Sequence, residues 1–372
     1  MSNIAIDLTS TPKNKTGIGR YLYNLIHSLQ KVDKINHYYL LIQDDDIEGF
    51  NLYSKNFNIV PVKSKILRKT YIRILWEQFV LPSILKSLSI DLLHSPNFTI
   101  PYFSKVKKIV TFHDMTYFIY PNVHTLLKRE LFKLYIRLSS DKANAIISIS
   151  HNTELDIIKY TNSKLPIFVT PLGVDWRFYA NNNFDKETLK QYGIDFKYFL
   201  YVGTIEPRKN LLRLIKAYNM LDLSIKDEYK LVICGKRGWM YSEIYEYIQS
   251  ENLESYIHFT DYVKDEHLPL LYKNAILFLY VSIYEGFGIP IIESMSCGTP
   301  TITSNTSSMA EISGDSVILI DPYNEESIKN AILNILQNEN VRETLIHKGP
   351  VQAKKYTWDN CAKLTVEAYN SI

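Results

Sequence analysis

The sequence predicts an α/β protein with two doubly wound, parallel-sheet domains, and three observations support this. The chain has 372 residues, whereas a single hydrophobic core rarely grows beyond about 250 residues before the chain splits into domains. Short apolar runs alternate with helical patterns of apolar residues, which is typical of βα units in a parallel sheet. This alternation pauses over residues 171–195 and then starts again. We therefore expect the junction between the domains in that stretch.

The first half of the chain carries the pattern of one such domain. Residues 21–29 place apolar side chains on one face of a helix. Another helix is expected to open at Ser150 or Asn152, because a side-chain oxygen there can accept hydrogen bonds from free first-turn amides. The strands are expected at the short apolar runs 4–8, 38–42, 91–94, 108–112, 145–150 and 167–170.

The second half repeats the pattern and ends in a further helix. Strands are expected at residues 198–202, 230–234, 257–260, 275–280, 300–303 and 317–320. Helices are expected at residues 211–221, 242–250, 290–297, 325–338 and 358–369.

Composition excludes several classes of protein. The chain is 46% hydrophobic and 22% charged, which excludes disordered and fibrous proteins. Cys234, Cys297 and Cys361 are at least 60 residues apart, a spacing that fits neither a disulfide framework nor a zinc site and suits a reducing compartment. No signal peptide is expected, since residues 1–8 resemble a strand. The longest apolar run, residues 275–281, is too short to span a bilayer.

The net charge of +3 is unevenly distributed. Residues 1–180 carry 23 Lys or Arg and 14 Asp or Glu, a balance of +9, and residues 181–372 carry −6. Such a split fits nucleic acid, an anionic membrane, an anionic substrate or ordinary solubility charge, but no nucleic-acid-binding motif is present. A basic amphipathic helix at a membrane surface is one interpretation of the segment with Lys63, Lys65, Arg68, Lys69, Arg73, Trp76, Phe79, Val80 and Leu81.

Candidate ligand-binding residues follow expected strands, where open parallel sheets bind their ligands. Gly17 and Gly19 precede the first helix, a position that allows close approach of a phosphate, although a plain turn is an equal alternative. Nicotinamide-binding loops have a third glycine, but Leu22 occupies that position here. His113 and Asp114 follow the strand at 108–112. His113 could bind a sugar hydroxyl or merely end the strand.

Two further clusters occur in the second half. Gly203 allows a tight turn after the strand at 198–202, and Arg208 and Lys209 then place two cations near a helix N-terminus, which suits a diphosphate. The most specific cluster runs from Glu285 through Gly286, Phe287, Gly288, Ile289 and Pro290 to Glu293. Its glycines leave backbone amides open to a ligand, and its two carboxylates can accept hydrogen bonds from hydroxyl groups at two depths of one crevice.

Together these motifs resemble those of the retaining glycosyltransferases of family 4, which have the two-domain GT-B architecture. The resemblance covers nearly the whole chain. It rests on the Glu-x7-Glu element at 285–293, the segment 203–210, the loop 17–19, the segment 170–175, the segment 296–300 and Trp358. It implies two Rossmann-like domains that face a central cleft: residues 1–180 for the acceptor and 181–355 for the nucleotide-sugar. Residues 356–372 are then a helix that crosses back to the first domain.

The resemblance also implies roles for the residues above. Arg208 and Lys209 would hold the donor diphosphate, Glu285 the donor sugar and Glu293 the ribose. Gly17 and Gly19 would close over the phosphates, and His113 would contact the sugar near the reacting carbon. Further contacts with the donor are expected from Gly203, Val263, Gly286, Phe287, Gly288 and Ile289, with Asp261, Tyr262 and Val263 near the base.

The implied reaction transfers a hexose from a nucleotide-sugar to an acceptor hydroxyl with retained configuration. Because no Asp-x-Asp motif accompanies the site residues, we expect neither a cofactor nor an obligatory metal. The sequence looks most like bacterial surface-polysaccharide mannosyltransferases, which implies GDP-mannose and a lipid-linked glycan acceptor. The expected location is the cytoplasm or the inner face of its membrane. The alternatives are a UDP- or dTDP-sugar donor, a nucleotide-sugar epimerase, and an inactive binding subunit.

Overall fold

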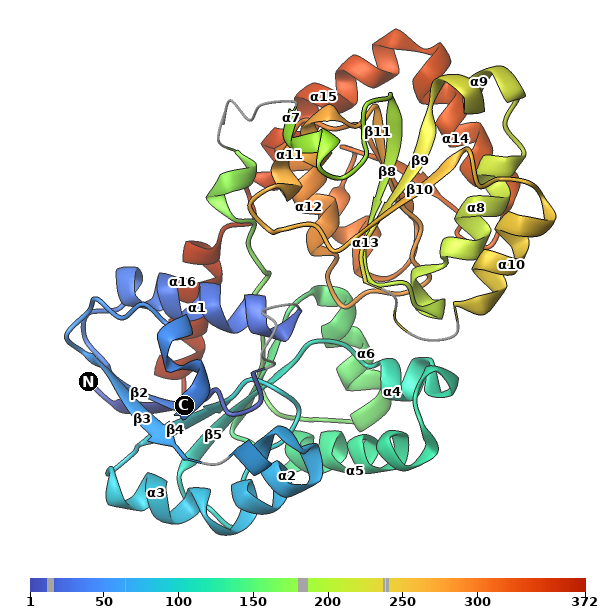
Figure 1. The fold of residues 1–372 in the computed structure, drawn as a ribbon. Helices are drawn as coiled ribbons and strands as arrows, with labels where there is room; N and C mark the ends of the chain where they lie inside the picture. The colour runs from blue at the N-terminus through green and yellow to red at the C-terminus, as the bar shows by residue number, and fades with distance from the viewer. Residues whose placement is uncertain (12–16, 64, 180–186, 237, 239–240) are drawn as a thin grey trace. The chain divides into compact units, whose positions relative to one another are not determined.

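A computed structural model describes residues 1–372 except 12–16, 64, 180–186, 237 and 239–240 (Figure 1). The described chain forms two compact units. Unit 1 comprises Met1–Gly173 and Thr357–Ile372, and unit 2 comprises Val174–Tyr356. The boundary expected between residues 180 and 181 lies outside the described residues.

Unit 1 contains a parallel sheet of seven strands in the order β3-β2-β1-β4-β5-β6-β7. The register pairs Ile6 of β1 with Leu40 of β2 on one side and with His94 of β4 on the other. The strands are β1 (Asn3–Asp7), β2 (His37–Gln43), β3 (Phe57–Val62), β4 (Leu92–Ser95), β5 (Lys107–Phe112), β6 (Ala145–Ser148) and β7 (Ile167–Val169).

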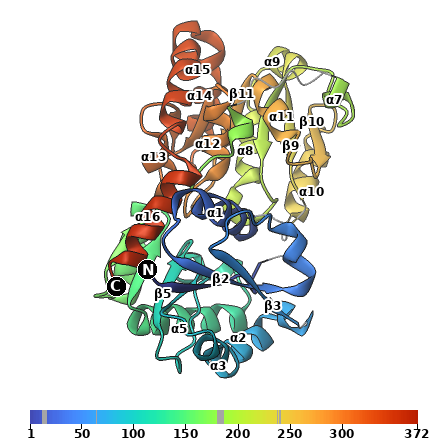
Figure 2. The ribbon, with the colours of Figure 1, turned by 90° about the vertical axis from the view of Figure 1, so that its left-hand side faces the viewer.

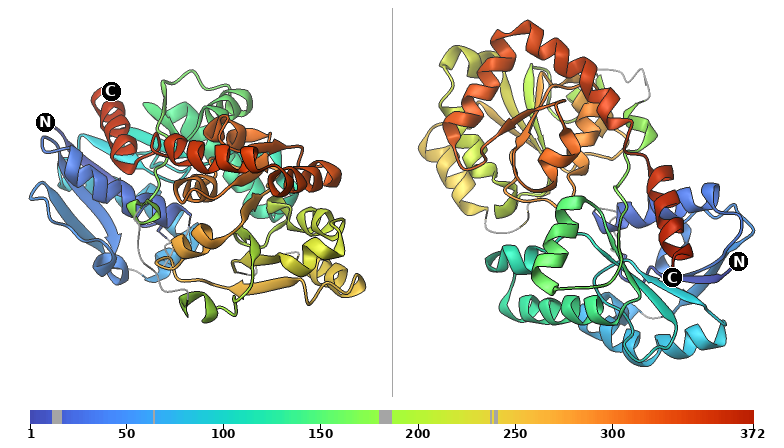
Figure 3. Two further views of the ribbon diagram at one scale, coloured as in Figure 1. Left: turned by 90° about the horizontal axis from the view of Figure 1, so that it is seen from above. Right: turned by 180° about the vertical axis from the view of Figure 1, so that it is seen from behind.

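Helices cover both faces of this sheet (Figures 1 and 3). Two helices from opposite ends of the chain cover one face, α1 (Ile18–Val32) and α16 (Trp358–Asn370). The others are α2 (Thr70–Phe79), α3 (Leu81–Ser87), α4 (Thr116–Ile119), α5 (Leu126–Lys142) and α6 (His151–Thr161), and there are short 3-10 helices at Asp44–Gly49, Lys65–Arg68 and Pro121–Val123.

Helix α16 is part of unit 1, where it packs beside α1 (Figure 2). The Ser28 hydroxyl of α1 donates to Asp359 of α16 at 2.7 Å. The chain passes so close to the start of α16 that a Cβ atom on Gly173 would lie 2.1 Å from the backbone nitrogen of Trp358. Only glycine fits there without a backbone shift, so the helix is fixed against the end of the first segment of unit 1.

Unit 2 contains a parallel sheet of six strands in the order β10-β9-β8-β11-β12-β13. Its central strands are apolar and buried on both faces, as expected for a sheet enclosed by helices. The strands are β8 (Tyr198–Val202), β9 (Lys230–Cys234), β10 (Ile257–Asp261), β11 (Leu277–Tyr280), β12 (Thr301–Ser304) and β13 (Ile318–Ile320).

The helices of unit 2 also lie on both sheet faces (Figure 1). Helices α8 (Leu211–Asn219), α10 (Ser242–Ser250) and α14 (Glu325–Gln337) pack on one face through a single hydrophobic core. The remaining helices are α7 (Glu187–Lys190), α9 (Leu223–Glu228), α11 (Leu268–Asn274), α12 (Ile289–Ser296), α13 (Ser307–Ser313) and α15 (Glu339–Ala353), with 3-10 helices at Trp176–Phe178 and Pro207–Lys209.

The structure confirms the expected alternation of strands and helices, but it also contains helices that were not expected, among them α5, α11, α13 and α15. It differs further in unit 1 between residues 57 and 87. Strand β3 was not expected, because Asn58 and Pro61 interrupt its apolar pattern; it is an edge strand, where a proline is tolerated. The single basic amphipathic helix expected over residues 63–81 is wrong. A 3-10 helix, α2 and α3 occupy that stretch, and Leu81 is fully buried.

Within the described residues, no helix combines the length and the apolar character needed to cross a membrane.

Substitution of Gly173 by alanine should lower the free energy of unfolding by about 2–3 kcal/mol, because the new methyl group overlaps the backbone of Trp358. Gly298→Ala is the matched control. Gly298 has φ +72°, and no neighbouring atom lies nearer than 3.6 Å to its Cβ position. The Gly298→Ala substitution should therefore lower the free energy of unfolding by only about 1 kcal/mol, the strain of a left-handed alanine. Urea denaturation measures both variants, and equal losses would contradict the close approach at Gly173.

Candidate active site

The first part of the site is the turn that follows β8. Pro207–Lys209 form a 3-10 turn, and Asn210 then adopts a left-handed conformation with φ 61° before α8 begins. The Asn210 side-chain amide is buried and donates to the carbonyls of Val281 at 3.0 Å and Pro322 at 2.7 Å. These bonds fix the turn against the segment after β11, so the cations at 208 and 209 are held against that segment.

The second part is the loop between β11 and α12, which contains the Glu-x7-Glu element. Gly288 has φ 110°, a conformation that favours glycine, and Pro290 occupies the first turn of α12. The Ser308 hydroxyl donates to the carbonyls of Glu285 and Phe287, both at 2.8 Å, and the Glu285 amide donates to the Ser307 hydroxyl at 3.0 Å. Helix α13 thus holds the loop in one conformation.

These two parts meet in a buried cluster of charges. Arg208 donates to Glu285 Oε2 at 2.7 Å, to the Tyr284 carbonyl at 2.7 Å and to Glu206 at 2.7 Å. Lys209 donates to Glu285 Oε1 at 2.7 Å and to the Tyr280 hydroxyl at 2.6 Å. Glu285 therefore bridges both cations. The sequence assigned Arg208 and Lys209 to the diphosphate and Glu285 to the donor sugar, whereas the structure joins all three in one ion-pair network.

The network fixes the charge state of its members. Burial alone raises the pKa of Glu285, but the charges of Arg208 and Lys209 and their hydrogen bonds lower it to about 2. Burial lowers the pKa of Lys209, and Glu285 counteracts this shift. Burial also raises the pKa of Tyr280 far above its usual value, as does the charge of Glu285. At neutral pH Glu285 is accordingly a carboxylate and Tyr280 keeps its proton.

Glu293 lies in α12, and its contacts differ from those of Glu285. Its carboxylate is buried and accepts a hydrogen bond from the Tyr272 hydroxyl of α11 at 3.1 Å. Its negative charge contributes to raising the pKa of Cys297 and, to a lesser extent, that of Cys234, although burial is the larger cause for both thiols. Through Tyr272, Glu293 links α12 to α11.

Three loops at the carboxyl edge of the sheet are joined by backbone hydrogen bonds. The Gly203 amide donates to the Cys234 carbonyl, and the Gly235 amide donates to the Asp261 carbonyl, both at 2.9 Å. A Cβ atom on Gly235 would lie 2.0 Å from the Gly203 carbonyl oxygen, so these loops require glycine. Val263, expected near the base, follows β10 and is buried.

The other candidates lie in unit 1, and the structure brings them together there. Gly17, with φ 53°, caps α1, Gly19 lies in the first turn, and Tyr21 follows on the same helix. The Tyr21 ring packs edge-on against His113 with 4.9 Å between centroids. The Thr16 position beside Gly17 lies outside the described residues.

His113 is held in one tautomer. Its Nε2 lies 2.8 Å from the Pro96 carbonyl oxygen, which can only accept, so this nitrogen carries the proton. Burial lowers the pKa of His113, which keeps the ring neutral near pH 7. Its Nδ1 is therefore the acceptor of the ring. Asp114 does not share this role, because it accepts from the amide and hydroxyl of Thr116.

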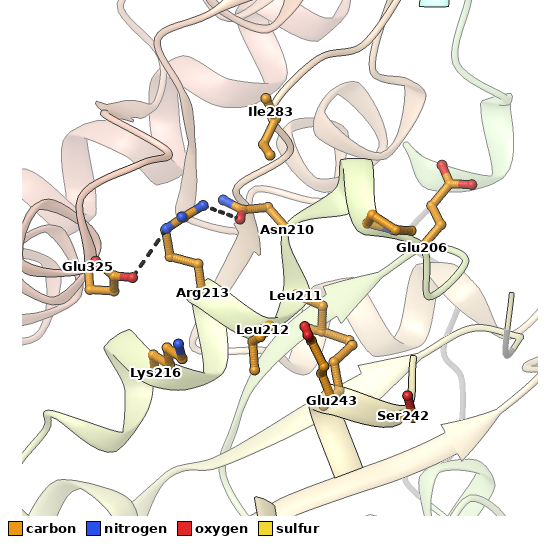
Figure 4. Close-up of a pocket in the computed structure, with 12 residues that line it drawn as sticks. Glu206, Asn210, Leu211, Leu212, Arg213, Lys216, Ser242, Glu243, Ile283 and Glu325 are labelled. Carbon is orange, nitrogen blue, oxygen red and sulfur yellow. Dashed lines mark hydrogen bonds and ion pairs between the residues drawn. The ribbon is translucent and has the colours of Figure 1, made fainter. Parts of the chain in front are cut away.

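The structure also contains two cavities that were not predicted from the sequence. The cavity of unit 2, about 410 Å³, lies beside the turn Pro207–Lys209, between α8 and α10 (Figure 4). Arg213 spans it between Asn210 at 2.7 Å and Glu325 at 3.2 Å. Its lining comes from Glu206, Pro207, Asn210, Leu211, Leu212, Arg213, Lys216, Ser242, Glu243, Ile244, Ile283 and Glu325. These residues come from several distant segments, so no local motif marks them.

The cavity of unit 1 measures about 330 Å³ and lies beyond the end of β1. Aromatic side chains and polar groups share its wall. It is lined by Thr9, Ser10, Thr11, Ile18, Leu67, Arg68, Thr70, Arg73, Asn97, Phe98, Tyr117, Lys128 and Phe132. Asp45 and Asp46 fix the Arg68 guanidinium, and the buried Arg73 pairs with Glu77 at 3.0 Å.

Metal-binding clusters of three or more His, Cys, Asp or Glu residues are not found among the described residues.

Two curated proteins and two solved structures resemble this chain over most of its length. O-antigen chain mannosyltransferase B of Escherichia coli is 34% identical over 75% of this chain and 74% of its own. O-antigen chain mannosyltransferase RfbU of Salmonella typhimurium is 26% identical over 89% and 90%. Sucrose-phosphate synthase of Thermosynechococcus elongatus has a TM-score of 0.81 at 18% identity, over 100% and 99% of the chains. Anabaena Alr3699/HepE in complex with UDP and glucose has a TM-score of 0.75 at 15% identity, over the whole of both chains.

Family models match both halves of the chain. Residues 15–178 match Glycosyltransferase Family 4, and residues 184–352 match Glycosyl transferases group 1. The solved structures share the GT-B fold of two Rossmann-like domains. Together with the identity to mannosyltransferase B, these matches show that the chain is a glycosyltransferase of family 4.

Proposed function

We propose that this glycosyltransferase moves mannose from GDP-mannose, with retained configuration, to a hydroxyl of a lipid-linked oligosaccharide or other glycan in surface-polysaccharide synthesis. The observation that carries the proposal is the buried network of Arg208, Lys209 and Glu285 beside the glycine loop of α12. The choice of mannose draws on the similarity to the two O-antigen mannosyltransferases. A UDP- or dTDP-sugar is the alternative donor.

The network suits a diphosphate that leaves during the reaction. Arg208 has five N–H donors in a planar fork and Lys209 has three. Both can therefore keep their hydrogen bonds to Glu285 and still donate to phosphate oxygens. The backbone amides at Gly286, Phe287, Gly288 and Ile289 precede a helix N-terminus, which favours an anion. Glu285 would hold the two cations in position and accept from a hydroxyl of the donor sugar, while Glu293 would bind the ribose.

The same groups would stabilise the transition state. As the bond between the sugar and the diphosphate breaks, negative charge grows on the leaving oxygen and the sugar becomes oxocarbenium-like. Preorganised cations lower the energy of that state without reorganising. The leaving phosphate oxygen would take the proton of the acceptor hydroxyl on the same face, which retains configuration without an enzyme nucleophile. Arg208 and Lys209 would thereby replace a metal ion.

Unit 1 would bind the acceptor and provide the remaining contacts with the donor. His113 is neutral, so its Nδ1 would accept a hydrogen bond from a hydroxyl of the donor sugar. Gly17 and Gly19 would approach the phosphates through the start of α1. The cavity of about 330 Å³ combines aromatic walls with guanidinium and amide groups, a mixture that suits a sugar ring, and we assign the acceptor glycan to it.

Nucleotide binding tests the donor first. GDP at 100 times its dissociation constant should stabilise the protein by about 2.7 kcal/mol, measured as a thermal shift beside UDP, dTDP and ADP at equal concentration. The shift should disappear in an Arg208→Ala, Lys209→Ala double variant. A larger shift with UDP or dTDP would replace the GDP assignment, and a full shift in the double variant would contradict the diphosphate site.

Turnover tests the transition-state role of Arg208. Arg208→Ala should lower kcat by about 10²–10³, the usual loss for one preorganised electrostatic donor. Arg342→Ala, which breaks the ion pair with Glu339 on α15, is the control and should keep near-normal turnover. The assay follows GDP release and glycan product in the presence of EDTA. Turnover that requires an added divalent ion would contradict metal independence, and an isomerised sugar nucleotide would indicate an epimerase.

Acid titration tests the ion-pair network. The folded pKa of Glu285 is about 2, below its usual 4.5, so the network contributes stability above pH 4.5 and loses it as the pH falls towards 2. The difference in unfolding free energy between the wild type and Glu285→Gln should be constant near neutrality and shrink below pH 4.5. Urea denaturation from pH 7 to pH 3 measures this, with the exposed Glu243→Gln as baseline. A difference that does not change with pH would contradict the network.

A further inference from the structure

Helix α2 exposes an apolar face to solvent in unit 1. Tyr71, Leu75 and Phe79 recur every four residues, so they form one stripe along the helix, and their exposed fractions are 49%, 58% and 69%. Val80 and Phe103 extend the stripe, and the Phe103 ring, 71% exposed, stacks on Phe79 with 6.0 Å between centroids. We call these five residues the α2 stripe. Figure 1 shows α2 along the lower edge of unit 1, with α3 beside it.

The opposite side of α2 already packs on the core, so the stripe is not the core-facing side of the helix. Ile72 and Trp76 pack against a cluster that includes Leu41 and Leu93 of the sheet. The sequence predicted a basic amphipathic helix with Trp76, Phe79, Val80 and Leu81 among its apolar residues, and this prediction was partly wrong. Trp76 faces the core and Leu81 is fully buried, whereas Phe79 and Val80 are exposed as expected.

The part of the chain that contains the α2 stripe is rich in basic residues. Residues 62–108 contain nine Lys or Arg and two carboxylates, a balance of +7. One of these carboxylates, Glu77, is buried against Arg73. In the sequence, exposed lysines precede α2 at Lys63 and Lys69, follow it at Lys86, and come shortly after Phe103 at Lys105 and Lys107. None of these five forms an ion pair with another residue of the described chain, so their charge remains available to an anionic partner.

We propose that the α2 stripe and its lysines bind unit 1 to the surface of an anionic phospholipid bilayer. Aromatic and leucine side chains flanked by lysine are the pattern of helices that lie in the headgroup region, and each basic group near an anionic leaflet adds to the attraction. A second copy of the chain fits less well, because it would place the same lysines against each other. The inference deepens the proposed function, since a lipid-linked acceptor is presented at such a surface.

Vesicle flotation with the full chain tests this surface. The protein should float with vesicles of phosphatidylcholine that contain 30% phosphatidylglycerol and should stay behind with pure phosphatidylcholine. Raising NaCl from 0.05 M to 0.5 M should weaken binding, because salt screens exposed charges. Equal flotation with both vesicle types would overturn the electrostatic part of the proposal, and no flotation with either would overturn it entirely.

Two variants separate the apolar from the charged contribution. Leu75→Ser with Phe79→Ser and Phe103→Ser should lower the bound fraction at least tenfold, and so should Lys63→Gln with Lys69→Gln and Lys105→Gln. Leu155→Ser is the matched control, since Leu155 on α6 is 66% exposed and outside the stripe. Its binding should equal that of the wild type. Equal binding by the stripe variant and the control would overturn the proposal.

Two further readouts distinguish the alternatives. Light scattering without lipid should give the same mass for wild type and stripe variant, and a dimer that dissociates only in the variant would identify a second copy as the partner instead. The stripe variant should keep its melting temperature and its release of nucleotide diphosphate with a soluble glycan acceptor. Because flotation measures no sugar transfer, vesicle binding by an inactive protein would refute only the proposed function.

Discussion

The buried ion pairs of Glu285 with Arg208 and Lys209 are the interaction on which the rest of the site depends. They join the turn after β8 to the loop after β11, two adjacent strands of the sheet of unit 2. Buried ion pairs lose much of their attraction to desolvation, so their main effect here is geometric. The side-chain amide of Asn210 holds the turn after β8, and the Ser308 hydroxyl holds the loop after β11. Together these contacts keep both cations in place.

The Tyr280 hydroxyl is directed into this network, whereas the hydroxyl of the buried Tyr201 donates to the Thr204 carbonyl at 3.4 Å. Burial keeps the pKa of Tyr280 and Tyr201 far above neutrality, so both remain neutral donors. The Tyr280 hydroxyl donates to Glu285 at 3.0 Å and accepts from Lys209. A protonated tyrosine therefore satisfies both a carboxylate and an ammonium group without adding charge.

The two units differ in chemistry in a way that fits a transfer between unlike substrates. Unit 2 concentrates fixed charge at the carboxyl edge of its sheet, which suits a nucleotide diphosphate. Unit 1 offers a neutral imidazole, a cavity with aromatic walls and, on α2, exposed apolar side chains among lysines. These features suit hydroxylated rings and a lipid surface. The helix α16 completes the core of unit 1, and Gly173 allows its close approach.

The sequence by itself determined the fold class, most strands and the segments that carry the site, because buried parallel strands are continuous apolar runs and their loops concentrate glycine and charge. It did not determine β3, which is an edge strand with Asn58 and Pro61. Nor did it determine the outward face of α2, the cavities or the bridging of both cations by Glu285. Residues 208 and 285 are far apart in the chain and meet only because β8 pairs with β11. Strand order is set by packing of the whole sheet, so contacts of this kind were decided by the tertiary structure alone.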